Sequence, residues 1–589
     1  MELLDGYVFN VLKVALGLGF VIFIHELGHF LLAKWNGVKV EKFSIGFGPA
    51  LVKFDHGETE YALSVIPLGG FVKMLGETAE ENAATSNDPR SYNNKSVGAR
   101  MAIISAGVIM NILLGLICFI IVYSQGVPEI PAVVGSVLPG TPAYEKGLRP
   151  GDEVIAINGK RGVDYQDLRR IVSLSAEGES VEFEIRRPGQ SEPIQMTILP
   201  RRDGEAMNPS IGVRAASDVI LWPGTPFLPP AGLDGWPRGP HGGFRGRDQV
   251  ISIGPPGAPV PTSTEFDINA VLLRFRDQPL EIEVQRNATI PGAPDPKVEA
   301  NPSEVGPEVS PTIITVPPVT YVDFGFRMGI EEIVSLRENG PAAQAGLKVG
   351  DVILKVNGRD DVDPLRLADL CAESVGKPVA LVVRRGTEEV HVNVTPVESP
   401  PDIEGTLGAI SAEPVDIPTL GMAFHVGNSI EAVRPGSVAE KAGIQPGMLL
   451  HSTRLTLSNL PGDENQVVPV TLGEARKAWP SVFRAIQGQP RRAVPFVLVT
   501  PDGKTKTTVW LLPEPVPGWF NPSRGLQFVP LSRQLPPQGV VESIKLGYND
   551  TVEGIVNIYQ TLRGLIQSRL SRKLIGGPIR IADVAYEHA

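Results

Sequence analysis

Two stretches of the chain are apolar over the length that a membrane-spanning helix needs. They run roughly from Val8 to Leu32 and from Met101 to Tyr123. About 20 apolar residues in a helix cross the hydrocarbon core of a bilayer, so we expect transmembrane helices within residues 1–34 and 101–124. A cleaved signal peptide is the alternative for the first stretch. That alternative fits poorly, because the first seven residues carry acidic but no basic side chains.

The loop between the two spans alternates apolar and polar residues around Tyr61, Leu63 and Val65, and Gly and Pro punctuate it. This pattern indicates a β-hairpin at the membrane surface, although an ordinary loop fits the pattern equally well. Lys and Arg gather at both ends of the loop, and none follows the second span until Lys146. By the positive-inside rule, residues 35–100 are cytoplasmic, and the N-terminus and the rest of the chain are extracytoplasmic.

A short pattern recurs after about Pro131. A strand, a Pro/Gly turn, a short Ala-rich helix ended by Gly, a second turn and a strand with Asn-Gly or its remnant follow one another. The copies span Val137–Gly159, Leu336–Gly358 and Val433–Gly447, and a degraded copy begins at Gly243. This order of elements resembles the PDZ domain in its bacterial strand arrangement, which implies tandem PDZ-like α+β domains.

A further helix is predicted near the end of the chain, where Ile544–Leu570 is amphipathic. Its apolar side carries Ile555, Ile558, Leu562, Leu565 and Ile566. The charged opposite side predicts a surface or interfacial helix and not a span.

These patterns together predict a multi-domain membrane protein in which transmembrane α-helices accompany tandem PDZ-like α+β domains. The predicted order is a first transmembrane helix (1–34), a cytoplasmic loop with a membrane-associated β-hairpin (35–100), a second transmembrane helix (101–124), a PDZ-like domain (131–202), a degenerate PDZ-like domain with Pro/Gly-rich insertions (210–318), a third PDZ-like domain (323–397), a linker (398–418), a fourth PDZ-like domain (419–514), an amphipathic helix (538–572) and a Gly-Gly-Pro segment before a missing transmembrane helix (573–589).

Composition adds three constraints. The 589 residues exceed what one core supports. Acidic residues outnumber basic ones by 65 to 54, which argues against nucleic acid as a partner. Cys118 and Cys371 are the only cysteines of the sequence and lie in different predicted domains, so no disulfide framework is expected.

Candidate chemistry lies in the first span, which contains His25-Glu-Leu-Gly-His29. On a helix, His25 and His29 are one turn apart and project from the same face. Two neutral imidazoles in this arrangement hold Zn²⁺, and Glu26 is placed to take a proton from water. Two hydrogen-bonded core histidines are the alternative. We favour zinc, because ionisable residues in a membrane-length helix are costly unless a polar site uses them.

Three other positions are candidates for binding. Asn111 lies in the second span, where an amide serves either helix–helix contact or a function. Gly329 and Gly421 lie in sequences that fit the carboxylate-binding loop of a PDZ domain, which takes the C-terminus of a peptide. A plain turn before a strand explains both glycines equally well.

The combined motifs resemble the site-2 protease family of intramembrane zinc metalloproteases, in its bacterial PDZ-bearing branch that cleaves anti-sigma factors. The resemblance rests on His25-Glu-Leu-Gly-His29, Gly46-Phe-Gly-Pro49, Pro67-Leu-Gly-Gly70, Asn111 and Gly576-Gly-Pro578, as well as the repeats. It implies that His25 and His29 are zinc ligands, that Glu26 activates water, that a membrane-associated β-loop precedes Gly70, and that Asn111 handles substrate.

The third zinc ligand of that family is an Asp in a Leu-Asp-Gly motif, in an apolar helix after Gly-Gly-Pro. This sequence ends before such a helix. Leu233-Asp-Gly235 does occur, but in a Pro/Gly-rich stretch predicted to be extracytoplasmic, so we expect it to be a decoy. The alternatives are a fragment of a longer protein, a partner that supplies the missing span, or an inactive enzyme, and we expect a fragment.

The resemblance implies regulated proteolysis of single-span membrane proteins in the bacterial inner membrane, by a multi-pass enzyme whose PDZ-like domains screen extracytoplasmic ends. The expected partners are a membrane-spanning protein substrate, peptide C-termini and the lipid bilayer. The competing hypothesis is a non-catalytic or split membrane-tethered scaffold that binds extracytoplasmic peptides. A soluble metalloprotease is a weaker third hypothesis, because it does not need an apolar helix.

Overall fold

The computed structural model describes residues 2–77, 88–176, 178–202, 208–223, 230, 243–291, 311–400, 403, 413–456, 467–472 and 477–566. Two compact units share these residues. Unit 1 comprises Met1–Val127 and Leu535–Ala589, and unit 2 comprises Pro128–Gln534. The Leu233-Asp-Gly235 and Gly576-Gly-Pro578 motifs lie outside the described residues.

Unit 1 is built on helices α1 (Glu2–Trp35) and α3 (Val97–Gln125), which pack against each other. Within the described part of the chain, two helical segments are long and apolar enough to cross a bilayer, Lys13–Trp35 and Val97–Gln125. Large apolar side chains on their outer faces are exposed, including those of Phe20, Ile104 and Val108. An exposed apolar surface of this kind suits lipid and not water.

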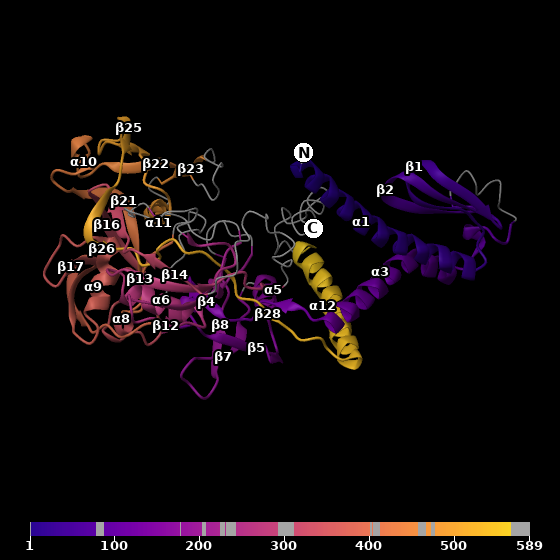
Figure 1. The fold of residues 1–589 in the computed structure, drawn as a ribbon, viewed down its shortest axis with the longest axis horizontal. Helices are drawn as coiled ribbons and strands as arrows, with labels where there is room; N and C mark the ends of the chain where they lie inside the picture. The colour runs from indigo at the N-terminus through magenta and orange to yellow at the C-terminus, as the bar shows by residue number, and fades with distance from the viewer. Residues whose placement is uncertain are drawn as a thin grey trace. The chain divides into compact units, whose positions relative to one another are not determined.

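A curled sheet made of β1 (Val40–His56) and β2 (Thr59–Met74) covers one end of α1 (Figure 1). Residues 40–45 pair on one side with residues 60–63 and on the other with residues 70–74. A small core joins this sheet to the helices through Phe43, Val72 and Ile103. A short 3-10 helix, η1 (Tyr92–Asn94), precedes α3.

Helix α12 (Val540–Ile566) packs against α3 in the same unit. Gly547 allows the close approach, since a Cβ there would lie 3.1 Å from the Ile120 side chain. The Tyr123 hydroxyl of α3 donates a hydrogen bond to Asp550. Ile555, Ile558 and Leu562 remain more than two-fifths exposed, which leaves the apolar side of this helix open.

The first repeat of unit 2 consists of two helices that alternate with strands along the chain. Its elements are β4 (Val134–Val137), α4 (Pro142–Glu145), β5 (Glu153–Ile157), β6 (Lys160–Arg161), α5 (Tyr165–Leu174), β7 (Val181–Arg186), β8 (Ile194–Ile198) and β9 (Val213–Ala215). The sheet order is β6-β5-β7-β8, and β4 pairs with β9. Two short strands, β3 (Pro128–Glu129) and β28 (Arg533–Gln534), pair where the chain enters and leaves unit 2.

The second repeat forms its own sheet in the order β14-β13-β11-β10-β27, with β12 beside β11. Its elements are β10 (Ser217–Leu221), β11 (Gln249–Gly254), β12 (Val260–Pro261), α6 (Glu265–Arg274), β13 (Leu280–Gln285), β14 (Thr312–Val316) and the late strand β27 (Phe528–Pro530). A reciprocal capping box between Thr264 and Asp267 starts α6.

The third and fourth repeats share one sheet, in the order β19-β18-β17-β16-β21-β22-β24-β25. The third contributes β16 (Phe326–Leu336), α8 (Pro341–Gln344), β17 (Val352–Val356), η3 (Pro364–Arg366), α9 (Leu367–Glu373), β18 (Val379–Arg385) and β19 (Glu388–Val394). The fourth contributes β20 (Val415–Ile417), β21 (Met422–Val433), α10 (Val438–Lys441), β22 (Leu449–Thr456), β23 (Val467–Thr471), α11 (Trp479–Gln487), β24 (Val494–Val499) and β25 (Lys506–Leu511). A separate pair, β15 (Thr320–Asp323) and β26 (Glu514–Phe520), flanks them.

This arrangement changes two predicted boundaries. Residues 398–418 contain β20, which pairs with β21, so the second half of that stretch belongs to the fourth repeat and is not a free linker. The predicted separation of 323–397 from 419–514 also disappears in the structure. Strands β16 and β21 pair along most of their length, and one core of buried residues serves both repeats.

The turn residues behave as their types require. Asn158-Gly159 and Asn357-Gly358 have positive φ at both positions, as two-residue hairpin turns of type I′ demand. Each Asn side chain also accepts a backbone N–H from a neighbouring strand of the sheet, from Glu182 of β7 and from Ala380 of β18. These hairpins set the register of the strands that follow.

One buried ion pair recurs in the first three repeats. An Asp after the second turn accepts the backbone N–H three residues before it and faces an Arg at the end of a later strand. The pairs are Asp152–Arg187 at 2.7 Å, Asp248–Arg286 at 2.5 Å and Asp351–Arg385 at 2.7 Å. Each Arg also donates to the carbonyl of a Gly, namely Gly147, Gly243 and Gly346. This Asp–Arg clamp is common to the first three copies, whereas the fourth copy has Met448 at the Asp position.

Arg524 joins three segments of unit 2. Its side chain is fully buried and donates to the carbonyls of Phe275, Gln278, Val316 and Pro317 at 2.6–2.9 Å. Burial lowers the pKa of its guanidinium to about 10, so it stays charged at neutral pH. The planar fork of an Arg suits several carbonyls at once, which a Lys ammonium cannot match.

We predict that Arg524→Ala lowers the free energy of unfolding of unit 2 by about 3 kcal/mol, because it strands several buried carbonyls. Arg524→Lys recovers only part of this loss. Denaturant unfolding followed by tryptophan fluorescence measures both, with the exposed Arg533→Ala as control. Equal stability of wild type and Arg524→Ala would contradict the assignment.

A second prediction concerns pH. Burial raises the pKa of Asp416 to about 6, although its carboxylate accepts from Tyr144 and faces Arg337 at 3.4 Å. An unfolded Asp titrates near 4, so between about pH 4 and pH 6 the native state binds more protons than the unfolded state. The contribution of Asp416 to the unfolding free energy therefore falls as pH rises through this window, by about 3 kcal/mol, and then levels.

Asp416→Asn removes this dependence, whereas Asn at the exposed Asp360 leaves it in place. Denaturant unfolding of the three proteins at pH 4, 5, 6 and 7 measures the difference. An Asp416→Asn profile parallel to that of wild type would show that Asp416 does not titrate in this range.

Candidate metal centre

The two membrane-length helices approach closely at glycines. A Cβ on Gly28 of α1 would lie 2.5 Å from the carbonyl oxygen of Ala106 on α3. No side chain larger than hydrogen fits at that point without moving a helix. Small residues at helix crossings allow this kind of backbone contact in membranes.

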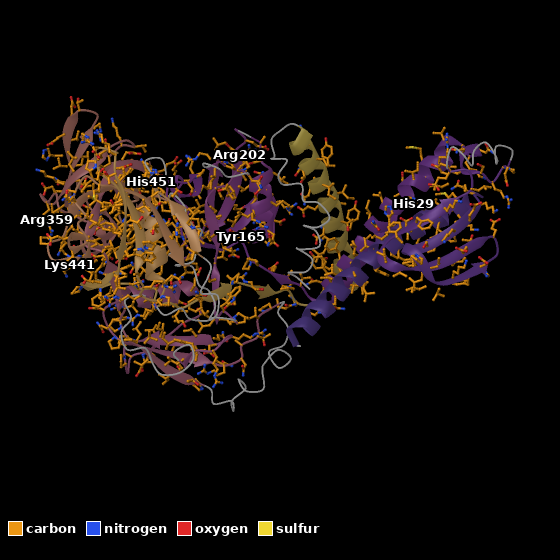
Figure 2. The ribbon with its side chains drawn as sticks, turned by 90° about the horizontal axis from the view of Figure 1, so that it is seen from above. His29, Tyr165, Arg202, Arg359, Lys441 and His451 are labelled. Carbon is orange, nitrogen blue, oxygen red and sulfur yellow. The ribbon has the colours of Figure 1, made fainter. Side chains whose placement is uncertain are left out.

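His25 and His29 lie on the face of α1 that turns toward α3, and both side chains are half-buried. Their ring centroids are 4.9 Å apart and the ring planes are nearly perpendicular. Their Nε2 atoms face each other at 3.2 Å. Figure 2 labels His29 on α1, next to the β1–β2 sheet of unit 1.

This geometry fits a zinc ion. Two Zn–N bonds of about 2.0–2.1 Å at a tetrahedral angle place the nitrogens roughly 3.3 Å apart. Room for the ion comes from Gly107 of α3, since a Cβ on Gly107 would lie 2.5 Å from the Nε2 atoms of both His25 and His29. The hydrogen of Gly107 therefore leaves open the position that the two imidazoles share.

The outer nitrogens of both rings are bonded to α3. His29 Nδ1 lies 2.7 Å from the carbonyl oxygen of Ile103, and a carbonyl only accepts, so His29 carries its proton on Nδ1. His25 Nδ1 lies 3.2 Å from Asn111 Nδ2. Asn111 Oδ1 is buried and has no partner among the described residues.

Glu26 lies beside the histidines and close to the sheet. A Cβ on Gly70 of β2 would lie 3.0 Å from Glu26 Cγ, so the absence of a side chain on Gly70 admits the carboxylate stem. Residues 70–74 pair with β1 on one side only, which leaves an open strand edge near Glu26. Among the residues that the structure describes, no three His, Cys, Asp or Glu side chains gather into a metal-binding group. The described part thus supplies two ligands.

The two glycines proposed for carboxylate binding differ in their surroundings. Gly329 lies inside β16, where a Cβ would meet Glu431 Oε1 at 2.8 Å. Gly421 has φ of +67°, and its N–H already bonds to the carbonyl of Ile417. Gly421 does border a cavity of about 190 Å³ together with Arg149 and Arg337, so positive charge is near. Carboxylate binding at either glycine stays a prediction.

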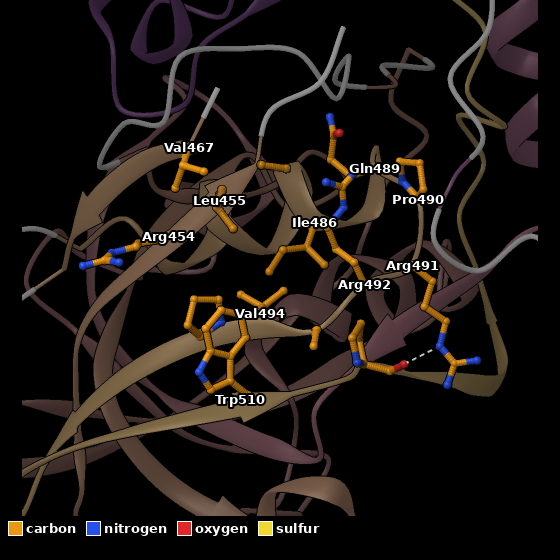
Figure 3. Close-up of a pocket in the computed structure, with 14 residues that line it drawn as sticks. Arg454, Leu455, Val467, Ile486, Gln489, Pro490, Arg491, Arg492, Val494 and Trp510 are labelled. Atoms are coloured by element: carbon orange, nitrogen blue, oxygen red, sulfur yellow. Dashed lines mark hydrogen bonds between the residues drawn. The ribbon is translucent and has the colours of Figure 1, made fainter. Parts of the chain in front are cut away.

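A further pocket, of about 200 Å³, lies in the fourth repeat (Figure 3). It opens where β22 and β24 diverge, because their pairing ends at Thr453 and Phe496. Leu455, Ile486 and Val494 line it together with Trp510, which is 68% exposed. Three arginines, Arg454, Arg491 and Arg492, are also among the residues that line it, and Arg491 Nε donates to the carbonyl of Pro513.

Sequence reasoning missed this pocket and the role of Gly107. A glycine in an apolar helix signals close packing, but the sequence does not say that the packing partner is a pair of imidazoles. The spacing from Gly107 to Asn111 is one helical turn, as is that from His25 to His29. The available signal was a Gly–Asn pair in the second span at the same spacing as the two histidines in the first.

A family model and several curated proteins match this chain, and their names agree with one another. A model of Peptidase family M50 matches residues 13–589. The Regulator of sigma-E protease RseP of Salmonella typhimurium is 32% identical over 345 residues, which cover 56% of this chain and 70% of that protein.

Shorter matches have higher identity. A protein of Clostridium acetobutylicum, named as a candidate zinc metalloprotease, is 39% identical over 194 residues, or 33% of this chain and 54% of its own length. The chain spans about half the length of the first curated relatives that it matches. A solved PDZ domain protein of Parabacteroides distasonis is 11% identical over 45% of this chain and 92% of that one, with a TM-score of 0.16, which carries no argument about the fold.

We predict that Gly107→Ala abolishes zinc binding and leaves the helices folded, because its methyl group occupies the position between the two Nε2 atoms. Metal analysis of the purified chain should find less than about one-tenth of the wild-type zinc content, the result expected of a clash well inside van der Waals contact. Circular dichroism checks that helix content is unchanged.

Gly115→Ala is the matched control, because it lies on the same helix and a Cβ there meets nothing within 4 Å. It should bind zinc as wild type does. Wild-type zinc content in Gly107→Ala would mean that the ion, if bound, lies elsewhere.

Proposed function

Because the chain belongs to Peptidase family M50, we propose that it acts as an intramembrane zinc metalloendopeptidase. The observation that carries this proposal is the pair of Nε2 atoms 3.2 Å apart inside a membrane-length helix, with Glu26 next to His25. Polar groups at such a position are costly in lipid unless they serve a site.

His25 and His29 would hold the ion, and catalytic zinc takes three protein ligands and one open position. The described residues supply these two ligands and no third one. When bound, zinc polarises the scissile carbonyl and makes water more acidic. Glu26 takes a proton from the attacking water as the C–O bond forms, and returns it to the amide nitrogen as the C–N bond breaks.

A transmembrane substrate hides its carbonyls in helical hydrogen bonds and must be locally unwound before cleavage. The open edge of residues 70–74 offers backbone groups to an extended segment, and Gly70 brings that edge to Glu26. This is the geometry needed to hold a substrate strand beside a catalytic carboxylate. The side chain of Asn111 also lies close to the histidines, with its Nδ2 atom 3.2 Å from His25 Nδ1.

The substrates that we propose are single-span membrane proteins such as anti-sigma factors, and the four repeats are proposed to be tandem PDZ-like domains that screen them. Extracytoplasmic ends already shortened by another protease would be admitted, and bulky folded domains would be held away from the bilayer. The pocket at Trp510 is lined by apolar side chains and three arginines, a combination that suits a peptide end that carries a carboxylate.

The proposed location is the bacterial inner membrane, with residues 35–100 in the cytoplasm and unit 2 outside it. This orientation puts the histidines near the cytoplasmic end of α1, about two and about three helical turns before Trp35. The lipid bilayer and a membrane-spanning substrate are then the partners of unit 1, and no role for nucleic acid is proposed.

A membrane-tethered scaffold that binds peptides and performs no chemistry is the second candidate. The size of unit 2 and its pocket favour it. The scaffold hypothesis does not explain why the two imidazoles face each other, or why Gly107 leaves the position between them open.

We predict that Glu26→Gln lowers the cleavage rate by a factor on the order of 10²–10⁴, since the amide cannot accept the proton from water. The assay uses the chain in detergent with a single-span anti-sigma factor that lacks its extracytoplasmic domain. Zinc content should not change, because Glu26 is not a ligand in the proposal.

Glu41→Gln is the matched control, because Glu41 lies on the sheet of unit 1 and pairs with Lys73. Full cleavage by Glu26→Gln would exclude the proposed base. Zinc binding without any cleavage by wild type, even with an added C-terminal span, would favour the scaffold.

A further inference from the structure

The first half of β21 completes the third repeat. Where α4 begins in the first repeat, the N–H of Ala143 bonds to the carbonyl of Ile211, two residues before β9. Where α8 begins in the third repeat, the N–H of Ala342 bonds in the same way to the carbonyl of Leu420, two residues before β21. The start of β21 then pairs with the second half of β16, as β9 pairs with β4. The start of β21 is therefore the counterpart of β9, and it serves the third repeat although it follows that repeat along the chain.

The other edge of this part of β21 is covered by β20. Residues 415–417 pair antiparallel with residues 422–424. Strand β20 also contacts α9, the second helix of the third repeat. In the first repeat, by contrast, β9 pairs only with β4 among the strands that the structure describes. The third repeat thus holds an extra strand that touches both β21 and α9.

This extra strand has the features of a bound peptide. A peptide that adds a strand to a sheet edge is held by main-chain hydrogen bonds and by pockets for alternate side chains, and backbone N–H groups capture a terminal carboxylate. The side chain of Ile417 is fully buried in the shared core, and Val415, on the same face of the strand, packs against that core. The N–H groups of Leu420 and Gly421 donate to the carbonyl of Ile417 at 3.0 and 2.9 Å. The glycine predicted to bind a carboxylate therefore holds a carbonyl of the chain itself.

We propose that β20 is an intramolecular ligand that fills the peptide site of the third repeat, the edge of β21 beside α9. An external C-terminus binds there only when β20 leaves. The occupant indicates the class of peptide that the site accepts, with an apolar last residue, as Ile417, and a second apolar residue two positions before it, as Val415. This inference rests on the proposed PDZ-like role of the repeats.

Contacts with the first repeat hold β20 in place. The carboxylate of Asp416 accepts a hydrogen bond from the hydroxyl of Tyr144 in α4 and also faces Arg337 at 3.4 Å. Glu413, two residues before β20, lies 3.4 Å from Arg214 of β9. Release of β20 breaks these contacts, so opening of the third repeat is coupled to the position of the first.

Peptide binding to the full chain in detergent tests the proposal. The probe is a synthetic peptide of residues 411–417 with a free carboxylate on its last residue and a fluorophore on its N-terminus. Fluorescence polarisation measures its affinity, and the same peptide with a C-terminal amide shows whether the carboxylate is needed. Hydrogen exchange of residues 420–426 reports whether the edge of β21 is covered.

Two variants release β20 by different routes. Ile417→Gly removes its buried anchor, whereas Tyr144→Phe keeps the ring and removes only the hydroxyl that holds Asp416. Tyr165→Phe is the matched control, because the Tyr165 hydroxyl belongs to the same repeat and donates to the carbonyl of Val213, not to β20.

A segment tethered by a short linker competes as if it were present at about millimolar concentration. The peptide should therefore bind Ile417→Gly at least about 10-fold more tightly than wild type, and Tyr144→Phe more tightly by a smaller factor. Exchange of residues 420–426 should be faster in both variants than in wild type, and added peptide should slow it again. Tyr165→Phe should match wild type, and the amidated peptide should bind none of the proteins.

Equal affinity of the peptide for wild type and both variants would overturn the proposal, as would exchange of residues 420–426 that is as fast in wild type as in the variants. So would a folded Ile417→Gly that exchanges faster there and still binds no peptide, because the freed edge would not be a peptide site. If Ile417→Gly does not fold, wild-type affinity in Tyr144→Phe overturns the proposal. These results leave the proposed peptidase intact, whereas a wild-type chain that cleaves no substrate would overturn the peptidase and not the closure of the third repeat.

Discussion

The approach of α1 to α3 is the constraint on which the rest of unit 1 depends. Two imidazoles and a carboxylate lie on an otherwise apolar helix, where unpaired polar groups are costly. They are accommodated because Gly28 and Gly107 let the helix backbones meet, which brings the carbonyl of Ile103 and the amide of Asn111 to the outer ring nitrogens. A larger side chain at Gly28 would push the helices apart and separate the donors from their acceptors. The polar site and the helix packing are therefore a single structure.

Unit 2 handles buried charge differently. The Asp–Arg clamps and Arg524 place full charges in the interior of a protein, where desolvation opposes them. In each clamp a backbone N–H also bonds to the Asp and a glycine carbonyl also accepts from the Arg, so each charge has a backbone partner besides the other charge. Such groups fix where a turn meets a strand more than they add stability. They give the repeats a common geometry although little of their sequence is shared.

Much of this could be predicted from the sequence where the determining interaction is local. The spacing of His25 and His29 along one helix, the hairpins at Asn158 and Asn357, and the helix-ending glycines all depend on neighbours within a few residues. The Asp–Arg clamps join residues more than 30 positions apart, and Arg524 reaches carbonyls some 250 residues away along the chain. Which glycine would face the imidazoles depended on the rotation of α3 about its axis, and periodicity alone does not set that angle. The Gly-Gly-Pro segment lies outside the residues that the structure describes. The described residues also include no third ligand.

The shared sheet of the third and fourth repeats has a consequence for how the protein is dissected. Strand β16 pairs on one side with β17 and along most of the other side with β21. The sheet of the third repeat therefore continues directly into that of the fourth. Deleting either one would bare a long hydrogen-bonding edge flanked by core residues, the kind of surface that promotes aggregation. The smallest piece that can be expected to stay soluble is the pair. The two repeats would then have to be studied together, because they share one sheet and one core of buried residues.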